Sequence, residues 1–329
     1  MHHGGKAGGM LLAIMLLGTA AARAADSGAA RQPMADAWWT GPLLAASAGT
    51  LPPGHFLFEP YFFDMVPFAS YDSRGVAHDV PSENDFGSFS YVLYGVADRF
   101  SLGFIPRFGF EEIAGGKSSS TLQLGDWSLQ GQYQLTEFEE GHLLPTISLN
   151  VGETFPTGKF DQLDRSSDGF GSGAYTTALS LYSQDYFWMP TGRILRTRLN
   201  LTYATSSHVA LQNVSVYGTI AGFLGDADPG VSSYGDLAFE YSLTRNWVAA
   251  IDFWAEQDNP TRLSGVNEGN GPATPFVSRS GTGREMILAP AIEYNFSLNL
   301  GVIAGARIFV WGRNETATAA PVLAIDYVH

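Results

Sequence analysis

The stretch Leu122–Leu135, LQLGDWSLQGQYQL, decides how the chain folds. Alternate positions along it are glycine, aromatic or leucine, and the positions between them are polar: Asp126, Ser128, Gln130, Gln132 and Gln134. Because successive side chains of a β-strand point to opposite faces, the stretch predicts a strand with one wet and one apolar face. A soluble β-sandwich contains such strands, whereas a membrane β-barrel repeats them in segments of about 10 residues with polar positions toward the lumen.

The composition favours the barrel over the sandwich. Charged residues make up 15% of the 329 residues, against roughly 25% in typical soluble domains. Aromatic residues reach 13%, and the mean hydropathy is zero, which argues against a helical membrane protein. The formal net charge of −14 predicts no nucleic-acid partner, because phosphate binding requires clusters of Lys and Arg. The absence of cysteine excludes disulfides, thiolate zinc sites and cysteine nucleophiles.

Residues 1–24 have the pattern of a secretory signal peptide. Lys6 precedes a short apolar core, and Ala22-Arg23-Ala24 supplies a small-x-small cleavage pattern. The core is shorter than the ~20 residues of a spanning helix, so we expect export toward the outer membrane of a Gram-negative cell. Residues 25–54 are expected to form a periplasmic segment that packs into the barrel mouth. A disordered linker is the alternative, which the adjacent Trp38 and Trp39 disfavour.

From His55 to the end of the chain the pattern predicts one all-β domain, residues 55–329. This is a transmembrane antiparallel up-and-down β-barrel of about twelve strands, within a range of ten to fourteen. Short connections alternate with long ones, as expected when short periplasmic turns alternate with outer loops. The expected strands are residues 55–64, 87–96, 100–110, 122–135, 143–155, 173–183, 193–205, 232–243, 247–257, 285–296, 299–311 and 317–328.

Polar and charged residues at alternate positions are predicted to line the lumen and to set its selectivity. A charge facing lipid at mid-bilayer would cost ~2–4 kcal/mol, which favours the inward orientation. Two interpretations stay open: a salt-bridge layer that fills a narrow barrel, or a charged constriction through which solute passes. The predicted lining residues are Arg107, Asp126, Gln130, Arg196, Arg198, Asp236, Glu240, Asp252, Glu256, Glu293, Arg307 and Asp326.

Three stretches resemble the outer-membrane proteins grouped under the meta-cleavage pathway of phenol degradation. The first begins Trp38-Trp39-Thr40-Gly41-Pro42 and continues through Thr50-Leu51-Pro52-Pro53-Gly54. The second is Leu124-Gly125-Asp126, and the third is Phe155-Pro156-Thr157-Gly158-Lys159-Phe160. The resemblance covers residues 36–329. It implies an outer-membrane barrel that transports small aromatic or other hydrophobic compounds, and it carries no catalytic residues.

Enzyme chemistry is not expected. The chain after the signal peptide has five histidines, His55, His78, His142, His208 and His329, and none begins a His-x-Ser signature. The hydrolase and phosphate-binding motifs G-x-S-x-G, H-E-x-x-H and the Gly-rich loop are missing. Asp164, Ser166 and Asp168 start like a calcium loop, but position twelve is Tyr175 rather than glutamate. We expect neither a cofactor nor a metal.

The predicted function is a passive outer-membrane channel or carrier for small molecules, porin-like in its mode of transport. The alternatives are a structural or adhesive barrel with a closed lumen and a barrel-embedded hydrolase. Expected partners are outer-membrane lipid and lipopolysaccharide, the barrel-assembly machinery and a small-molecule solute. Within the loop 206–231, the apolar run Val214–Leu224 is either a plug, or a hydrophobic site where solute enters, or a pair of extra short strands.

Overall fold

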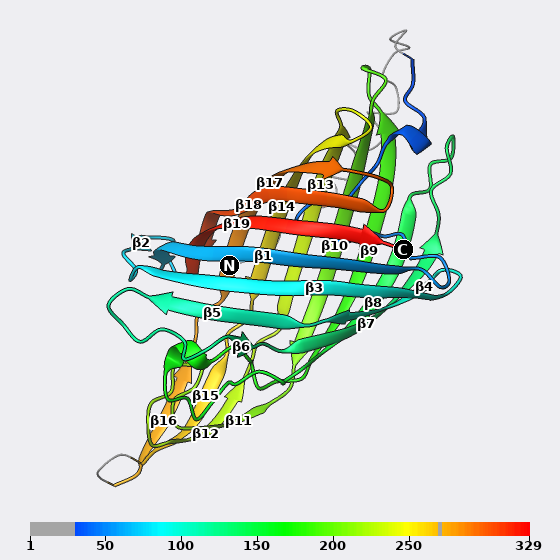
Figure 1. Cartoon of the computed structure of the whole chain (residues 1–329). Helices are drawn as coiled ribbons and strands as arrows, with labels where there is room; N and C mark the ends of the chain where they lie inside the picture. The colour runs from blue at the N-terminus through cyan, green and yellow to red at the C-terminus, as the bar shows by residue number, and fades with distance from the viewer. Residues whose placement is uncertain (1–29, 269–271) are drawn as a thin grey trace, which may run out of the picture.

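The computed structural model describes residues 30–268 and 272–329 of the chain, so the signal peptide expected at residues 1–24 lies outside the described part. These residues form a closed antiparallel barrel of twelve strands, as the alternation predicted (Figure 1). Closure is made where β1, Phe56–Tyr71, pairs with both β19, Glu315–Val328, and β3, Glu83–Ala97. No helix of the described residues is long and apolar enough to cross a membrane.

The remaining wall strands follow one another in chain order. Two wall strands are interrupted: β4 and β5 break at Pro106, and β6 and β7 break at Gly125 and Asp126. The wall strands after β3 are β4 (Phe100–Ile105) with β5 (Arg107–Ile113), β6 (Gln123–Leu124) with β7 (Trp127–Thr136), β8 (Thr146–Phe155), β9 (Thr176–Trp188), β10 (Ile194–Ser206), β13 (Ser232–Ser242), β14 (Trp247–Asp258), β17 (Gly283–Asn295) and β18 (Leu300–Arg313).

Side chains alternate between a lipid face and a lumen face, as β7 illustrates. Leu129 and Tyr133 are each 51% exposed on the outer surface, whereas Gln132 and Gln134 are buried inside. Exposed apolar side chains recur in this way around the wall and form the surface that contacts hydrocarbon. Examples are Phe62, Val92, Leu129, Val151, Leu179, Tyr203, Phe253, Ile308 and Leu323.

The two barrel ends differ as expected for a spanning barrel. At the end that carries the C-terminus the connections are mostly short, such as Asp98–Arg99 between β3 and β4 (Figure 1). Trp247 and Tyr294 pair there with ring centroids 4.6 Å apart, in the position of an interfacial aromatic girdle. We take this end as periplasmic. The opposite end, with the longer loops, is the outer end.

A second, four-stranded sheet projects beyond the outer end (Figure 1). Its strands are β11 (Val209–Gln212), β12 (Phe223–Asp228), β15 (Arg262–Asn267) and β16 (Thr274–Arg279). Most of the run Val214–Leu224 is the connection between β11 and β12, and only its last two residues belong to a strand. The extra short strands lie on either side of the run rather than within it. Leu211 and Phe223 pack in the core of this outer sheet.

A histidine between two carboxylates fastens this sheet at its base. His208 Nδ1 lies 2.7 Å from Asp228 Oδ1, and His208 Nε2 lies 3.0 Å from Asp226 Oδ1. Hydrogen bonds with Asp228 first and Asp226 second raise the pKa of His208 above its ordinary value. The protonated ring can donate to both carboxylates, which the neutral ring cannot do.

Candidate functional site

The N-terminal segment, defined here as residues 30–54, runs through the periplasmic half of the barrel. Its backbone bonds in succession to inward side chains of β17, β14, β10, β8, β7 and β4. The segment therefore follows the inner wall past more than half of the barrel strands. Leu43 also packs against Tyr61 of β1 and Ile303 of β18, so the segment contacts the wall next to the β1–β19 pairing as well.

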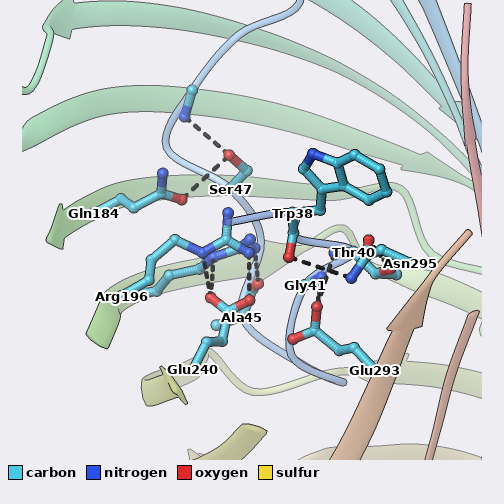
Figure 2. Close-up of polar contacts among 12 residues, drawn as sticks. Trp38, Thr40, Gly41, Ala45, Ser47, Gln184, Arg196, Glu240, Glu293 and Asn295 are labelled. Atoms are coloured by element: carbon cyan, nitrogen blue, oxygen red, sulfur yellow. Dashed lines mark hydrogen bonds and ion pairs between the residues drawn. The ribbon is translucent and has the colours of Figure 1, made fainter. Parts of the chain in front are cut away.

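Two buried carboxylates hold the first half of this segment. Asp252 of β14 accepts hydrogen bonds from the backbone N–H groups of Leu43 (3.0 Å), Leu44 (3.3 Å) and Ala45 (3.0 Å). Glu293 of β17 accepts from the N–H groups of Thr40 (2.8 Å) and Gly41 (3.2 Å), and Figure 2 shows the Glu293 contact with Gly41. Such charge-assisted bonds are stronger than neutral ones, so these acids act as anchors for the segment.

The two arginines of β10 share a single carboxylate. Arg196 makes two parallel hydrogen bonds to Glu240 of β13, one of them from Nε at 2.6 Å (Figure 2). Arg198 Nε lies 3.2 Å from the same Glu240, while its Nη1 donates to the carbonyl oxygen of Ala45 at 2.8 Å. All three charged side chains are buried. The two arginines thus share Glu240 as their paired carboxylate and are covered by the N-terminal segment.

The polar face of the Leu122–Leu135 stretch contacts the second half of the segment. Gln132 Nε2 donates to the carbonyl oxygen of Ser47 at 3.0 Å, and Gln134 Oε1 accepts from the N–H of Thr50 at 3.0 Å. Ser148 on β8 donates to the carbonyl oxygen of Ala48. These polar side chains replace water as hydrogen-bonding partners of an extended backbone, which satisfies that backbone inside the barrel.

Small residues on both sides allow this close approach. The segment itself is small and narrow from Ala45 to Gly49. On the wall, a Cβ added at Gly95 of β3 would overlap the carbonyl oxygen of Pro52, and one at Gly301 of β18 would overlap the Thr40 side chain. Glycine at these two wall positions is therefore required by the segment.

A cavity of about 100 Å³ remains beside the segment on the β1–β3 side. It is lined by Glu59, Tyr61, Tyr91, Gln130, Arg198 and Asp326, among others. Since one water occupies ~30 Å³ of liquid, this space holds a few waters. It is too small for the ~300–1,000 Å³ typical of ligand sites.

The predicted lining residues fall into four groups in the structure. Arg196, Arg198, Glu240, Asp252 and Glu293 contact one another or the N-terminal segment, and Gln130 and Asp326 line the 100 Å³ cavity. Asp236 is 1% exposed, and neither of its carboxylate oxygens has a hydrogen-bond partner among the described residues.

The other four lie toward the outer end. Arg307 pairs with Glu285 at 2.9 Å, and Glu256 accepts from Ser232 and Trp254. Arg107 lies in a separate outer pocket, and Asp126 lies under an outer loop. Within residues 30–268 and 272–329, no group of three or more His, Asp or Glu side chains could hold a metal ion.

Asp126 clamps the outer loop between β8 and β9. Its Oδ1 accepts from the N–H of Gly158 at 2.9 Å, and its Oδ2 accepts from the N–H and hydroxyl of Ser172 at 2.7 and 2.8 Å. Thr157 Oγ1 donates to the carbonyl oxygen of Gly125 at 3.0 Å. The Gly-Asp and Pro-Thr-Gly motifs singled out in the sequence therefore meet in space, where they fasten this loop to the wall.

Comparison with known proteins supports the fold. No family model matches the sequence, and no curated protein matches it significantly. The crystal structure of the COG4313 outer membrane channel from Pseudomonas putida F1 has a TM-score of 0.65 with this chain at 15% sequence identity, covering 88% of this chain and 100% of that chain. The fold is that of an outer-membrane β-barrel. With its apolar belt, it places the chain in the cell outer membrane.

Two more distant structures share less of the architecture. The β domain of the Bordetella autotransporter BrkA has a TM-score of 0.43 at 10% identity, covering 84% of this chain and 100% of that chain. A deletion mutant of the monoaromatic hydrocarbon channel TodX has a TM-score of 0.38 at 11% identity, covering 84% and 90%. Both values are too low to carry an argument about this chain.

Proposed function

We propose that the protein is an outer-membrane channel through which small molecules pass passively, and that its N-terminal segment narrows the periplasmic half. The supporting observation is the cavity of about 100 Å³ that runs beside the segment among polar and aromatic side chains. Pores discriminate by their lining groups and width. Ions and water fit this space, whereas a larger solute requires the segment to shift.

The solute class we propose is small aromatic or hydrophobic compounds. An aromatic ladder follows the inner face of β1 and β3, where Tyr61 stacks on Phe89 at 4.8 Å and Phe63 lies 6.0 Å from the same ring. Tyr91 continues the ladder 5.5 Å from Phe89 and lines both the narrow cavity and the wider outer pocket. Ring faces along a path favour flat apolar solutes over sugars.

Planar-bilayer conductance and liposome uptake test this function. We expect the full-length protein to give small, discrete current steps, and a variant lacking residues 31–46 to give larger ones. Phenol should enter proteoliposomes faster than a sugar of similar mass. Absence of current and of uptake in both proteins would contradict the channel.

A closed structural barrel is the second candidate, and the many bonds to the N-terminal segment favour it. It predicts no current from the full-length protein and a current after the deletion. We do not propose an enzyme, because all five histidines of the described residues are exposed rather than buried beside the lumen charges. A lipase and protease assay on the purified protein tests this point.

A further inference from the structure

A second and larger pocket opens in the outer half of the lumen. Its volume is about 340 Å³, which lies at the small end of the range for ligand sites, ~300–1,000 Å³. A single aromatic ring with one substituent matches such a volume. The residues that matter for its chemistry are Phe63, Asp85, Phe89, Tyr91, Arg107 and Phe170.

Aromatic rings enclose the pocket because the wall lacks side chains where the rings lie. A Cβ at Gly87 of β3 would overlap the ring of Phe63, and a Cβ at Gly109 of β5 would overlap the ring of Phe170. Phe170 belongs to the outer loop that Asp126 clamps, so the clamp fixes this ring over the pocket. The wall glycines and the clamp together hold ring faces around an open space.

Arg107 gives this pocket a free positive charge. Three of the four arginines predicted to face the lumen are paired: Arg196 and Arg198 with Glu240, and Arg307 with Glu285. The guanidinium of Arg107 has no ion pair or hydrogen bond with any residue in the described part of the chain, and Arg107 is exposed where it lines the pocket. A guanidinium binds a carboxylate through two parallel hydrogen bonds.

We infer that this pocket is a binding site for aromatic monocarboxylates of benzoate size. The ring lies among Phe63, Phe89 and Phe170, and the carboxylate pairs with Arg107. Asp85 on the same pocket disfavours a second carboxylate on the ring, because like charges repel. Tyr91 lines both this pocket and the narrow cavity, so the site would lie on the transport path, and that part of the inference rests on the proposed function. The binding of the ligand itself does not depend on the proposed function.

Fluorine NMR of para-fluorobenzoate tests the site on the folded full-length protein in detergent, with no gradient and no transport. We expect saturable line broadening at millimolar ligand, competed by benzoate. Arg107→Gln should weaken binding about tenfold or more, because it removes a charged hydrogen-bonding partner. Phe170→Ala, in an outer loop, should weaken it severalfold. Arg262→Gln on the outer sheet is the matched control and should leave binding unchanged.

Other ligands in the same NMR experiment separate the contribution of the carboxylate from that of the aromatic ring. Para-fluorobenzyl alcohol and para-fluorobenzylammonium should bind at least about tenfold more weakly than para-fluorobenzoate, and fluoroterephthalate should also bind more weakly. Absence of saturable broadening, or equal binding by Arg107→Gln protein that still shows the folded gel mobility, would overturn the inference. Binding without bilayer current would support the binding site and contradict the proposed channel. Current without binding would support the channel and contradict the binding site.

Discussion

Asp252→Asn should loosen the N-terminal segment while leaving the barrel intact. Asp252 Oδ2 accepts one backbone N–H and Oδ1 accepts two, all from residues 43–45. An asparagine presents one oxygen and one NH₂ group, so in either orientation at least one of these N–H groups faces a donor. A buried group that loses its partner costs ~1–3 kcal/mol. This corresponds to about 5- to 150-fold in the population of the released segment.

The chain has no native cysteine, so a single introduced thiol reports on that release. Ala48 is completely buried, and Ala48→Cys should react with a small thiol reagent when the segment leaves the wall. If the segment returns to the wall faster than the thiol reacts, the labelling rate is proportional to the population of the released segment. That rate should therefore rise by the same 5- to 150-fold in the Asp252→Asn background, and bilayer recordings should show longer high-conductance states. Asp258→Asn, at the outer end of the same strand, is the control.

The reasoning would be refuted by equal labelling rates in the Asp252→Asn and Asp258→Asn proteins. Loss of the folded form on an unheated gel would instead mean that Asp252 stabilises the wall itself. In that case deletion of residues 31–46 should also destabilise the barrel, which thermal unfolding measures directly.

Three further predictions concern other contacts. Glu240→Gln removes the carboxylate that both buried arginines share, which costs ~3–5 kcal/mol. We expect a lower thermal unfolding temperature by circular dichroism, whereas Glu315→Gln should leave that temperature nearly unchanged. Asp126→Ala removes three hydrogen bonds to the loop 156–175, so trypsin should cleave that loop faster while the barrel core stays resistant. His208 stabilises the outer sheet most below its unfolded pKa of ~6.5. Because its folded pKa is raised, that contribution is lost as pH rises through the folded value, so the hydrogen-exchange protection factors of the outer-sheet amides should fall there, but not in His208→Gln protein.

The strand alternation was enough to predict the barrel, because each face has its own solvent. Where the pattern breaks, the prediction of strand limits was wrong. The first strand was expected at residues 55–64 but extends to Tyr71, since Asp64 and Pro67 interrupt the pattern and the register shifts between Pro67 and Ala69. Pro106 divides the third wall strand for a similar reason: it has no N–H to donate to the ladder.

The partners of the lumen charges could not be predicted from sequence. Alternation tells which side of the wall a residue faces, and it predicted that Arg196 and the acids of neighbouring strands face the lumen. It contains no information about the N-terminal segment, whose residues lack periodicity and whose contacts are distant in sequence. The run of small residues from Ala45 to Gly49, next to two tryptophans, was the available signal that this segment fits a narrow space.

The seam between β1 and β19 has a consequence for biogenesis. It joins the first and last strands of the wall, and residues 37–51 are enclosed behind it. Residues 37–51 precede every strand of the wall in the chain, so their surroundings are complete only after the last strand has been added. Either this segment is bound in place while the barrel closes around it, or it enters through the periplasmic opening after β1 and β19 have paired.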